Sequence, residues 1–189
     1  MRRLAEMGRE ELADAVKRIA WGYVLLHVNV NLGSLNILPN WLGYLLILGV
    51  LPILGEREPS ALLLRPLGIL LALWEGVLWA LTLFGIPFNS ITLSIIAAAV
   101  GLYFHFQLLT NLAEIAGRYG CPEQRKILCL RTVRTLLVTG LSLPVPWARY
   151  AGLTLGVAVV NLAAALWICS LLFSLRSSLE GAGRLAGTE

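Results

Sequence analysis

Charged side chains are scarce in this sequence. Only 14% of the residues are Asp, Glu, Lys or Arg and 58% are hydrophobic, whereas a soluble globular domain has roughly 25% and 45–50%. Leucine-rich runs recur between Ile19 and Leu175, and each is close to the roughly 20 residues that a bilayer-spanning helix needs. This composition predicts an all-α, polytopic membrane protein.

Signatures of soluble-type chemistry are also missing. The three cysteines form no C-x-x-C pair and are odd in number, so they indicate neither a zinc site nor a disulfide framework. There is no G-x-S-x-G, H-E-x-x-H, Walker or dinucleotide motif. These absences favour a protein that is not an enzyme, and the net charge of +4 reflects the sidedness of a membrane protein rather than a nucleic-acid partner.

Six apolar runs define the expected topology. We predict a bundle of six transmembrane helices over residues 19–35, 39–54, 61–84, 91–115, 127–143 and 151–175. Residues 1–18, with Leu12, Val16 and Ile19 at helical spacing, predict a cytoplasmic amphipathic helix at the membrane surface. Residues 19–175 would form the membrane domain, and the glycine-rich residues 176–189 a flexible cytoplasmic tail.

The basic residues agree with this topology. If the N terminus is cytoplasmic, fourteen of the 15 Lys and Arg residues lie in inner segments and only Arg149 lies outside. Positive charge gathers on the cytoplasmic side of membrane proteins. We therefore expect a multi-pass protein of the cytoplasmic (inner) membrane with both termini inside.

The six spans can also be divided into two inverted halves of three helices. The middle span of each half is short and bounded by prolines, with Pro39 and Pro52 in the first half and Pro144 and Pro146 in the second. Short, proline-interrupted segments at matching positions are typical of transporters that bind solute near the bilayer midplane.

Ionisable residues within the spans are the main candidates for function. Glu75 lies about 15 Å beyond Arg65 along its helix, and His27 and His105 lie about 14 and 20 Å from the basic residues that flank their spans. Because buried charge in a membrane is costly and usually functional, these three side chains are candidates for a proton or cation relay. The alternatives are interhelical hydrogen bonding and axial ligation of a haem by the two histidines.

Polar amides in the same spans are candidates for contact with a solute. Asn29 and Asn31 lie on opposite sides of the first span, and Gln107 and Asn111 share one stripe of the fourth. Such residues equally serve to join helices, at about 0.6–2 kcal/mol each.

Two further features concern lipids and oligomers. Arg125, Lys126, Arg131 and Arg134 form a basic cluster that we expect to meet anionic lipid headgroups. Gly152 and Gly156 form a G-x-x-x-G pattern, which predicts a helix-packing face and a homodimer.

The segment N-I-L-P-N-W-L-G-Y, residues 36–44, follows a polar-spotted helix. Over residues 20–44 this stretch resembles an uncharacterised family of small multi-pass membrane proteins of Gram-positive bacteria with an N-I-L-P-x-x-x-G-Y motif. The resemblance implies a bacterial membrane protein and carries no activity. The leading hypothesis is a small transporter or channel-like protein, with a non-catalytic membrane subunit and a haem-binding protein as alternatives.

Overall fold

The protein is almost entirely helical. The computed structural model describes residues 2–27, 31–32, 35–36, 39–141 and 151–186. Its helices are α1 (Arg2–His27), α2 (Asn40–Leu48), α3 (Leu51–Arg57), the 3-10 helix η1 (Pro59–Leu63), α4 (Leu64–Leu83), α5 (Ile91–Arg118), α6 (Glu123–Leu141) and α7 (Ala151–Ala186). Two short strands, β1 (Asn31–Leu32) and β2 (Leu35–Asn36), pair antiparallel with Asn31 opposite Asn36.

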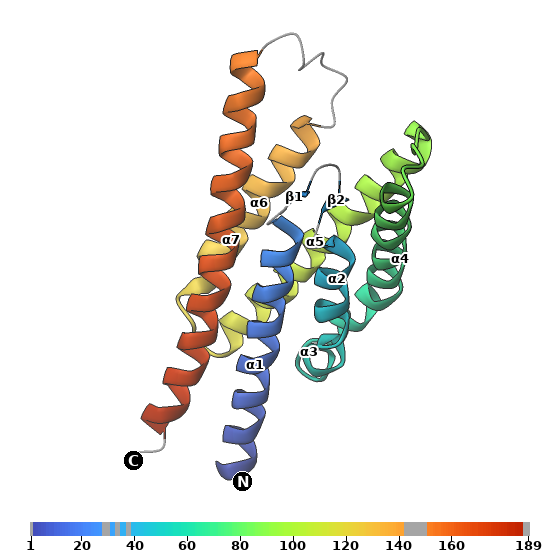
Figure 1. The fold of residues 1–189 in the computed structure, drawn as a ribbon. Coiled ribbons are helices and arrows are strands. Elements are labelled where there is room, and N and C mark those ends of the chain that lie inside the picture. Colours follow the sequence, from blue (N-terminus) through green and yellow to red (C-terminus); the bar gives the residue numbers. More distant parts are fainter. Residues whose placement is uncertain (1, 28–30, 33–34, 37–38, 142–150, 187–189) are drawn as a thin grey trace.

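The helices bring distant parts of the chain together. α1 runs antiparallel to α7, so the first and last helices lie side by side and both termini are at one end (Figure 1). α1 also packs on α2, and α5 packs on α4 and α6. The start of α1, the end of α7, α3 and the α5–α6 turn form what we call the charged end. The opposite end, around the α4–α5 turn, is the apolar end.

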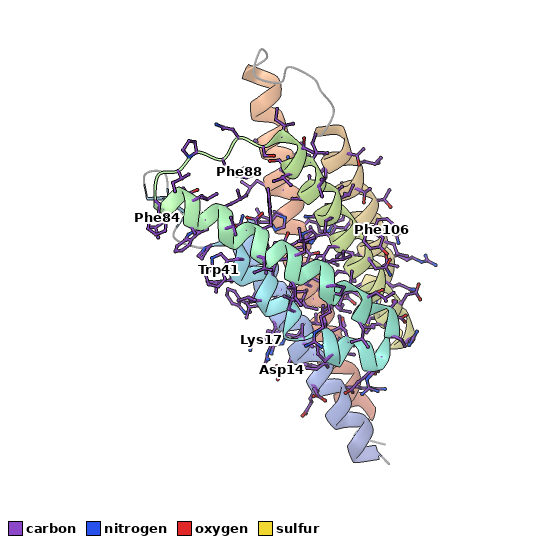
Figure 2. The ribbon with its side chains drawn as sticks, turned by 90° about the vertical axis from the view of Figure 1, so that its right-hand side faces the viewer. Asp14, Lys17, Trp41, Phe84, Phe88 and Phe106 are labelled. Carbon is purple, nitrogen blue, oxygen red and sulfur yellow. The ribbon has the colours of Figure 1, made fainter. Side chains whose placement is uncertain are left out.

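The two ends differ in their side chains. Figure 2 shows Asp14 and Lys17 near the middle of α1, away from the α4–α5 turn beside which Phe84 and Phe88 lie. At that turn Phe84 and Ile91 are 75% and 77% exposed. Because water would penalise so much exposed apolar surface, the apolar end is suited to a lipid environment.

Within the described residues, three helices, not six, are long and apolar enough to cross a membrane. They are Pro59–Leu83, which joins η1 to α4, then α5, and Val159–Gly181 of α7. The prediction of six is wrong for the first two spans because α2 has nine residues and α3 seven. At 1.5 Å per residue, α2 is only about 13 Å long. α6 does not qualify because Arg125, Lys126, Arg131 and Arg134 lower its hydropathy.

The first two expected spans instead form a hairpin that enters the bundle partway. α1 ends at His27, β1 and β2 follow, and α2 runs back toward the charged end. In Figure 1 the strands lie below the upper ends of α5, α6 and α7. Pro52, in the first turn of α3, has no N–H to donate, which fits the break after α2.

The amphipathic pattern of the N-terminal residues has a different use from the one expected. α1 continues unbroken past residue 18, and Leu12, Val16, Ile19 and Tyr23 are all fully buried. Their spacing of four, three and four residues places them on one helical face. That face lies in the protein core rather than on lipid headgroups.

Buried Glu123 ties the start of α6 to α7. Its Oε1 accepts hydrogen bonds from Ser174 Oγ at 2.7 Å and Ser178 Oγ at 2.8 Å. Burial by itself would raise the pKa of this carboxyl, but the two hydroxyls, the Glu123 N–H and Lys126 together hold the pKa below its ordinary value. The ionised carboxylate therefore stabilises the contact between α6 and α7.

The double variant Ser174→Ala, Ser178→Ala should lose about 1–3 kcal/mol of unfolding free energy at neutral pH, as expected for hydrogen bonds to a charged group. Since the folded-state pKa of Glu123 is lowered, its contribution is present above the unfolded pKa and is lost as pH falls through the folded value. Thermal unfolding in detergent at neutral and acidic pH measures this. The wild-type and variant curves should converge in acid, and an equal gap at both pH values would contradict the assignment.

Candidate functional site

His105 lies at the centre of a buried polar cluster. Its Nδ1 is 3.0 Å from the Tyr23 hydroxyl and its Nε2 is 3.4 Å from the Tyr44 hydroxyl. The imidazole is 4% exposed and the Tyr23 side chain is fully buried. A neutral imidazole donates from one nitrogen and accepts at the other, so one tyrosine accepts a hydrogen bond and the other donates one. This arrangement links α1, α5 and α2 by a continuous Tyr23–His105–Tyr44 series.

His27 adjoins this series through Tyr23. The two rings stack with centroids 5.8 Å apart and an interplanar angle of 15°, and His27 Nδ1 donates to the Tyr23 carbonyl at 2.9 Å. The Tyr23 and His105 centroids are 5.3 Å apart. The two histidines singled out in the sequence are therefore neighbours across one tyrosine ring.

Glu75 is held by Asn40, which the sequence analysis did not identify as a candidate. Asn40 Nδ2 donates to Glu75 Oε2 at 3.1 Å, which joins the start of α2 to α4. The Asn40 Oδ1 atom and the neighbouring Trp41 Nε1 are buried without a hydrogen-bond partner in the described part of the chain. In the sequence Asn40 is the second residue of the expected span 39–54 and lies 35 positions before Glu75, so no local pattern identified it as a partner of Glu75.

One cavity connects these groups. It has a volume of about 370 Å³ and is lined by Tyr44 from α2, Glu75 from α4, His105 from α5 and Arg134 from α6. The sequence predicted Glu75 and His105 as site residues and placed Arg134 among lipid headgroups. The structure brings Glu75 and His105 to the same cavity, and it adds Arg134 and Tyr44.

The four residues of the basic cluster have different surroundings. Arg125 and Lys126 are exposed, and their contact with lipid headgroups stays a prediction. Arg131 instead donates to Thr110 Oγ1 at 2.9 Å and lies 4.4 Å from the centroid of the Phe106 ring, and Figure 2 shows Phe106 on the α5 side that faces α6. Arg134, three residues later, lines the cavity.

Gln107 and Asn111, two of the amides expected to contact solute, do not line this cavity. Gln107 Nε2 lies 2.9 Å from the Asn111 amide, which also lies 2.9 Å from Ser60 Oγ. Asn111 is 1% exposed, and its amide joins α5 to η1 toward the charged end. Asn29 and the side chain of Asn31 lie outside the residues that the structure describes.

A haem held by two histidines does not fit these residues. The iron would need one nitrogen of each imidazole on opposite faces of the porphyrin. Both ring nitrogens of His105 instead lie near tyrosine hydroxyls, and the Tyr23 ring stacks on His27. Within the described residues, no group of three His, Cys, Asp or Glu side chains is placed to hold a metal ion.

The predicted dimer face remains a prediction. The surroundings of Gly152 are not among those that the structure describes. A Cβ atom added at Gly156 would meet no described atom within 4 Å, so in the part of the chain that the structure covers this face of α7 is open.

Comparison with known proteins identifies no protein similar to this chain. No family model matches the chain, and no curated protein or solved structure gives a significant match.

Proposed function

We propose that the protein is a small carrier of the cytoplasmic membrane that moves a solute together with a proton. The observation that carries the proposal is the shared cavity of Glu75, His105 and Arg134, which three different helices bring together. Ionisable side chains among apolar helices are costly and mark solute and proton pathways. Two of the three contributing helices, α4 and α5, are long and apolar enough to span a bilayer.

The hairpin formed by α1, the two strands and α2 supports this function. The strands β1 and β2 interrupt helical backbone between α1 and α2, next to the Asn40–Glu75 contact. Non-helical backbone at membrane depth is tolerated where protein covers it or where it lines a cavity. Transporters use such interrupted helices to build solute sites near the bilayer midplane.

Glu75 is the residue that takes up the transported proton in this scheme. Its carboxyl faces a cavity that also contains the Arg134 guanidinium. Protonation removes the negative charge and leaves the cavity with one fixed positive charge. The Tyr44–His105–Tyr23 series starts at the same cavity and provides a hydrogen-bonded route from it to α1.

The distribution of basic residues indicates how the carrier is oriented in the membrane. In the proposed orientation the charged end, with both termini and the exposed Arg125 and Lys126, faces the cytoplasm. A hairpin that enters and leaves at the same end keeps the sidedness that two full spans would have. The basic residues of α1, such as Lys17 and Arg18, and Arg57 after α2 therefore stay on the same side of the membrane.

Proton movement in proteoliposomes tests the function. Vesicles containing the protein and a trapped pH dye are challenged with a panel of short- and long-chain carboxylates, phosphate monoesters and ammonium compounds. At least one chemical class should change the internal pH about tenfold faster than in protein-free vesicles. Equal rates with and without the protein across the panel would reject a proton-coupled carrier.

A non-catalytic membrane subunit is the second candidate. A separate groove of about 530 Å³ lies between α2 and α4, and apolar side chains including Trp41, Leu73 and Trp79 line it. Such a groove can hold the helix of another subunit. This function predicts a stoichiometric partner after mild solubilisation, loss of that partner in a Trp41→Ala variant, and no proton movement beyond that of protein-free vesicles.

A further inference from the structure

We infer that the solute is a single-chain amphiphile with an anionic headgroup, bound with its headgroup at Arg134 and its chain along α5. The inference rests on the proposed function and names the class of its solute. It is carried by the Arg134 guanidinium, which has no hydrogen-bond or ion-pair partner among the described residues, and by an apolar groove that is continuous with the cavity.

Arg134 is suited to bind an anion. It is half-buried and has no hydrogen bond or ion pair to any described residue, in contrast to Arg118, which pairs with Glu58, and Arg176, which pairs with Glu180. A guanidinium among apolar helices is stabilised when a carboxylate or phosphate accepts its hydrogen bonds. The cavity therefore offers a guanidinium, unpaired among the described residues, to an anionic group of a solute.

The groove supplies a place for an apolar chain. It has a volume of about 760 Å³ and runs from the Phe88–Ser90 turn along α5 toward α6. Ser94, Ala98, Leu102 and Val138 line both the groove and the Arg134 cavity, so the two spaces adjoin. From Ser90 to His105 the helix rises about 22 Å. A long acyl or alkyl chain fits this length, and a small hydrophilic solute would leave the groove without an occupant.

The groups around Glu75 make the occupancy depend on protonation. The cavity is lined by Tyr44 from α2, His105 from α5 and Arg134 from α6. Asn40, also from α2, donates a hydrogen bond to the Glu75 carboxyl. Behind His105, α1 contributes Tyr23 and His27. Of these groups only Glu75 adds a negative charge, and its protonation removes the repulsion of an anionic headgroup. Binding of the amphiphile and of a proton are therefore linked.

Trp74 reports on the occupied cavity. Its side chain lines the cavity, and its ring packs edge to face on Phe88 at a centroid distance of 5.2 Å. The full-length protein in nanodiscs of unbrominated phosphatidylcholine is titrated, at mildly acidic pH, with chain-brominated ligands, whose bromines quench tryptophan on contact. The probes are a fatty acid, an alkyl phosphate monoester, an alkylammonium and phosphatidylglycerol. A Trp74→Phe variant isolates the signal of this tryptophan.

The fatty acid or the alkyl phosphate should quench Trp74 saturably at low mole fraction, and the anion that binds more tightly identifies the headgroup. Arg134→Gln should weaken this binding about tenfold, the equivalent of about 1.4 kcal/mol. Arg125→Gln removes the same charge from an exposed position of the same helix and should change it less than about twofold. Ala98→Phe, which fills the groove without altering charge, should also abolish the saturable quenching.

Three results would overturn the inference. These are equal quenching by the alkylammonium, quenching by phosphatidylglycerol alone, and equal losses in Arg134→Gln and Arg125→Gln. If thermal unfolding shows that the Arg134→Gln variant is not folded, the Ala98→Phe variant decides whether the amphiphile binds in the groove. Because this titration measures binding and not flux, a negative result alongside intact proton movement rejects the amphiphile and leaves the carrier.

Discussion

Replacement of Glu75 by glutamine should abolish proton-coupled movement of solute while leaving the protein folded. Glutamine keeps the side-chain length and an oxygen that can accept the hydrogen bond from Asn40 Nδ2, which lies 3.1 Å from Glu75 Oε2. It cannot release a proton, so the cavity stays in the state that corresponds to protonated Glu75. We expect solute-dependent internal acidification to fall at least about tenfold, because the proton-carrying step is lost.

The same variant should still bind the solute. With the negative charge removed permanently, binding should no longer weaken as pH rises, whereas wild-type binding weakens when Glu75 ionises. Glu114→Gln is the matched control, because Glu114 is exposed on α5 and does not line the cavity. Unchanged proton movement in Glu75→Gln, or an equal loss in Glu114→Gln, would remove Glu75 from the mechanism.

Valine at Gly22 or Gly43 should destabilise the hairpin strongly. A Cβ atom at Gly22 would lie 2.9 Å from the Gly43 carbonyl oxygen, and one at Gly43 would lie 2.7 Å from the Gly22 carbonyl oxygen. Backbone atoms cannot move aside as a flexible side chain can, so α1 and α2 must separate. Overpacking of this kind costs about 1–3 kcal/mol or more, and separation of α1 from α2 would also disturb the Tyr23–His105–Tyr44 series.

Thermal unfolding in detergent measures the effect, which should be a clear fall in Tm for each valine variant. Gly76→Ala is the control, because its added Cβ would meet Trp41 atoms only at 3.9 Å, an ordinary contact. Within a helix, alanine should be neutral or stabilise by about 0.5–1 kcal/mol relative to glycine. Equal melting of Gly22→Val and Gly76→Ala would show that the backbones of α1 and α2 do not need this close approach.

Several features followed from periodicity and composition because they depend on local sequence. The structure confirms helices over most of the third, fourth and sixth expected spans. The α4–α5 and α5–α6 turns contain Gly85 and Gly120 at φ values of 68° and 66°, a conformation that glycine adopts without strain. Glu75 and His105 were identified because an ionisable side chain in an apolar run is conspicuous wherever the helix points.

The first two spans show where local sequence was insufficient. Residues 19–54 are as apolar as a pair of membrane helices, yet α1 begins far earlier, its buried face extends to Leu12, and α2 ends after nine residues. An apolar run has the same composition whether lipid or protein covers it. Only the packing of α1 against α7 and α2 decides between the two.

The sequence by itself determined that this is an apolar, helical protein, where its charges gather, and that Glu75 and His105 lie within apolar helices. The tertiary structure decided that three helices are long and apolar enough to cross a membrane, that Asn40 bonds Glu75, and that Arg134 turns into the cavity. Depth along a helix follows from residue number, since each residue adds a fixed rise. The direction in which a side chain faces depends on which helix packs beside it, and that is set by contacts such as the one between Gly22 and Gly43, which are 21 positions apart in sequence.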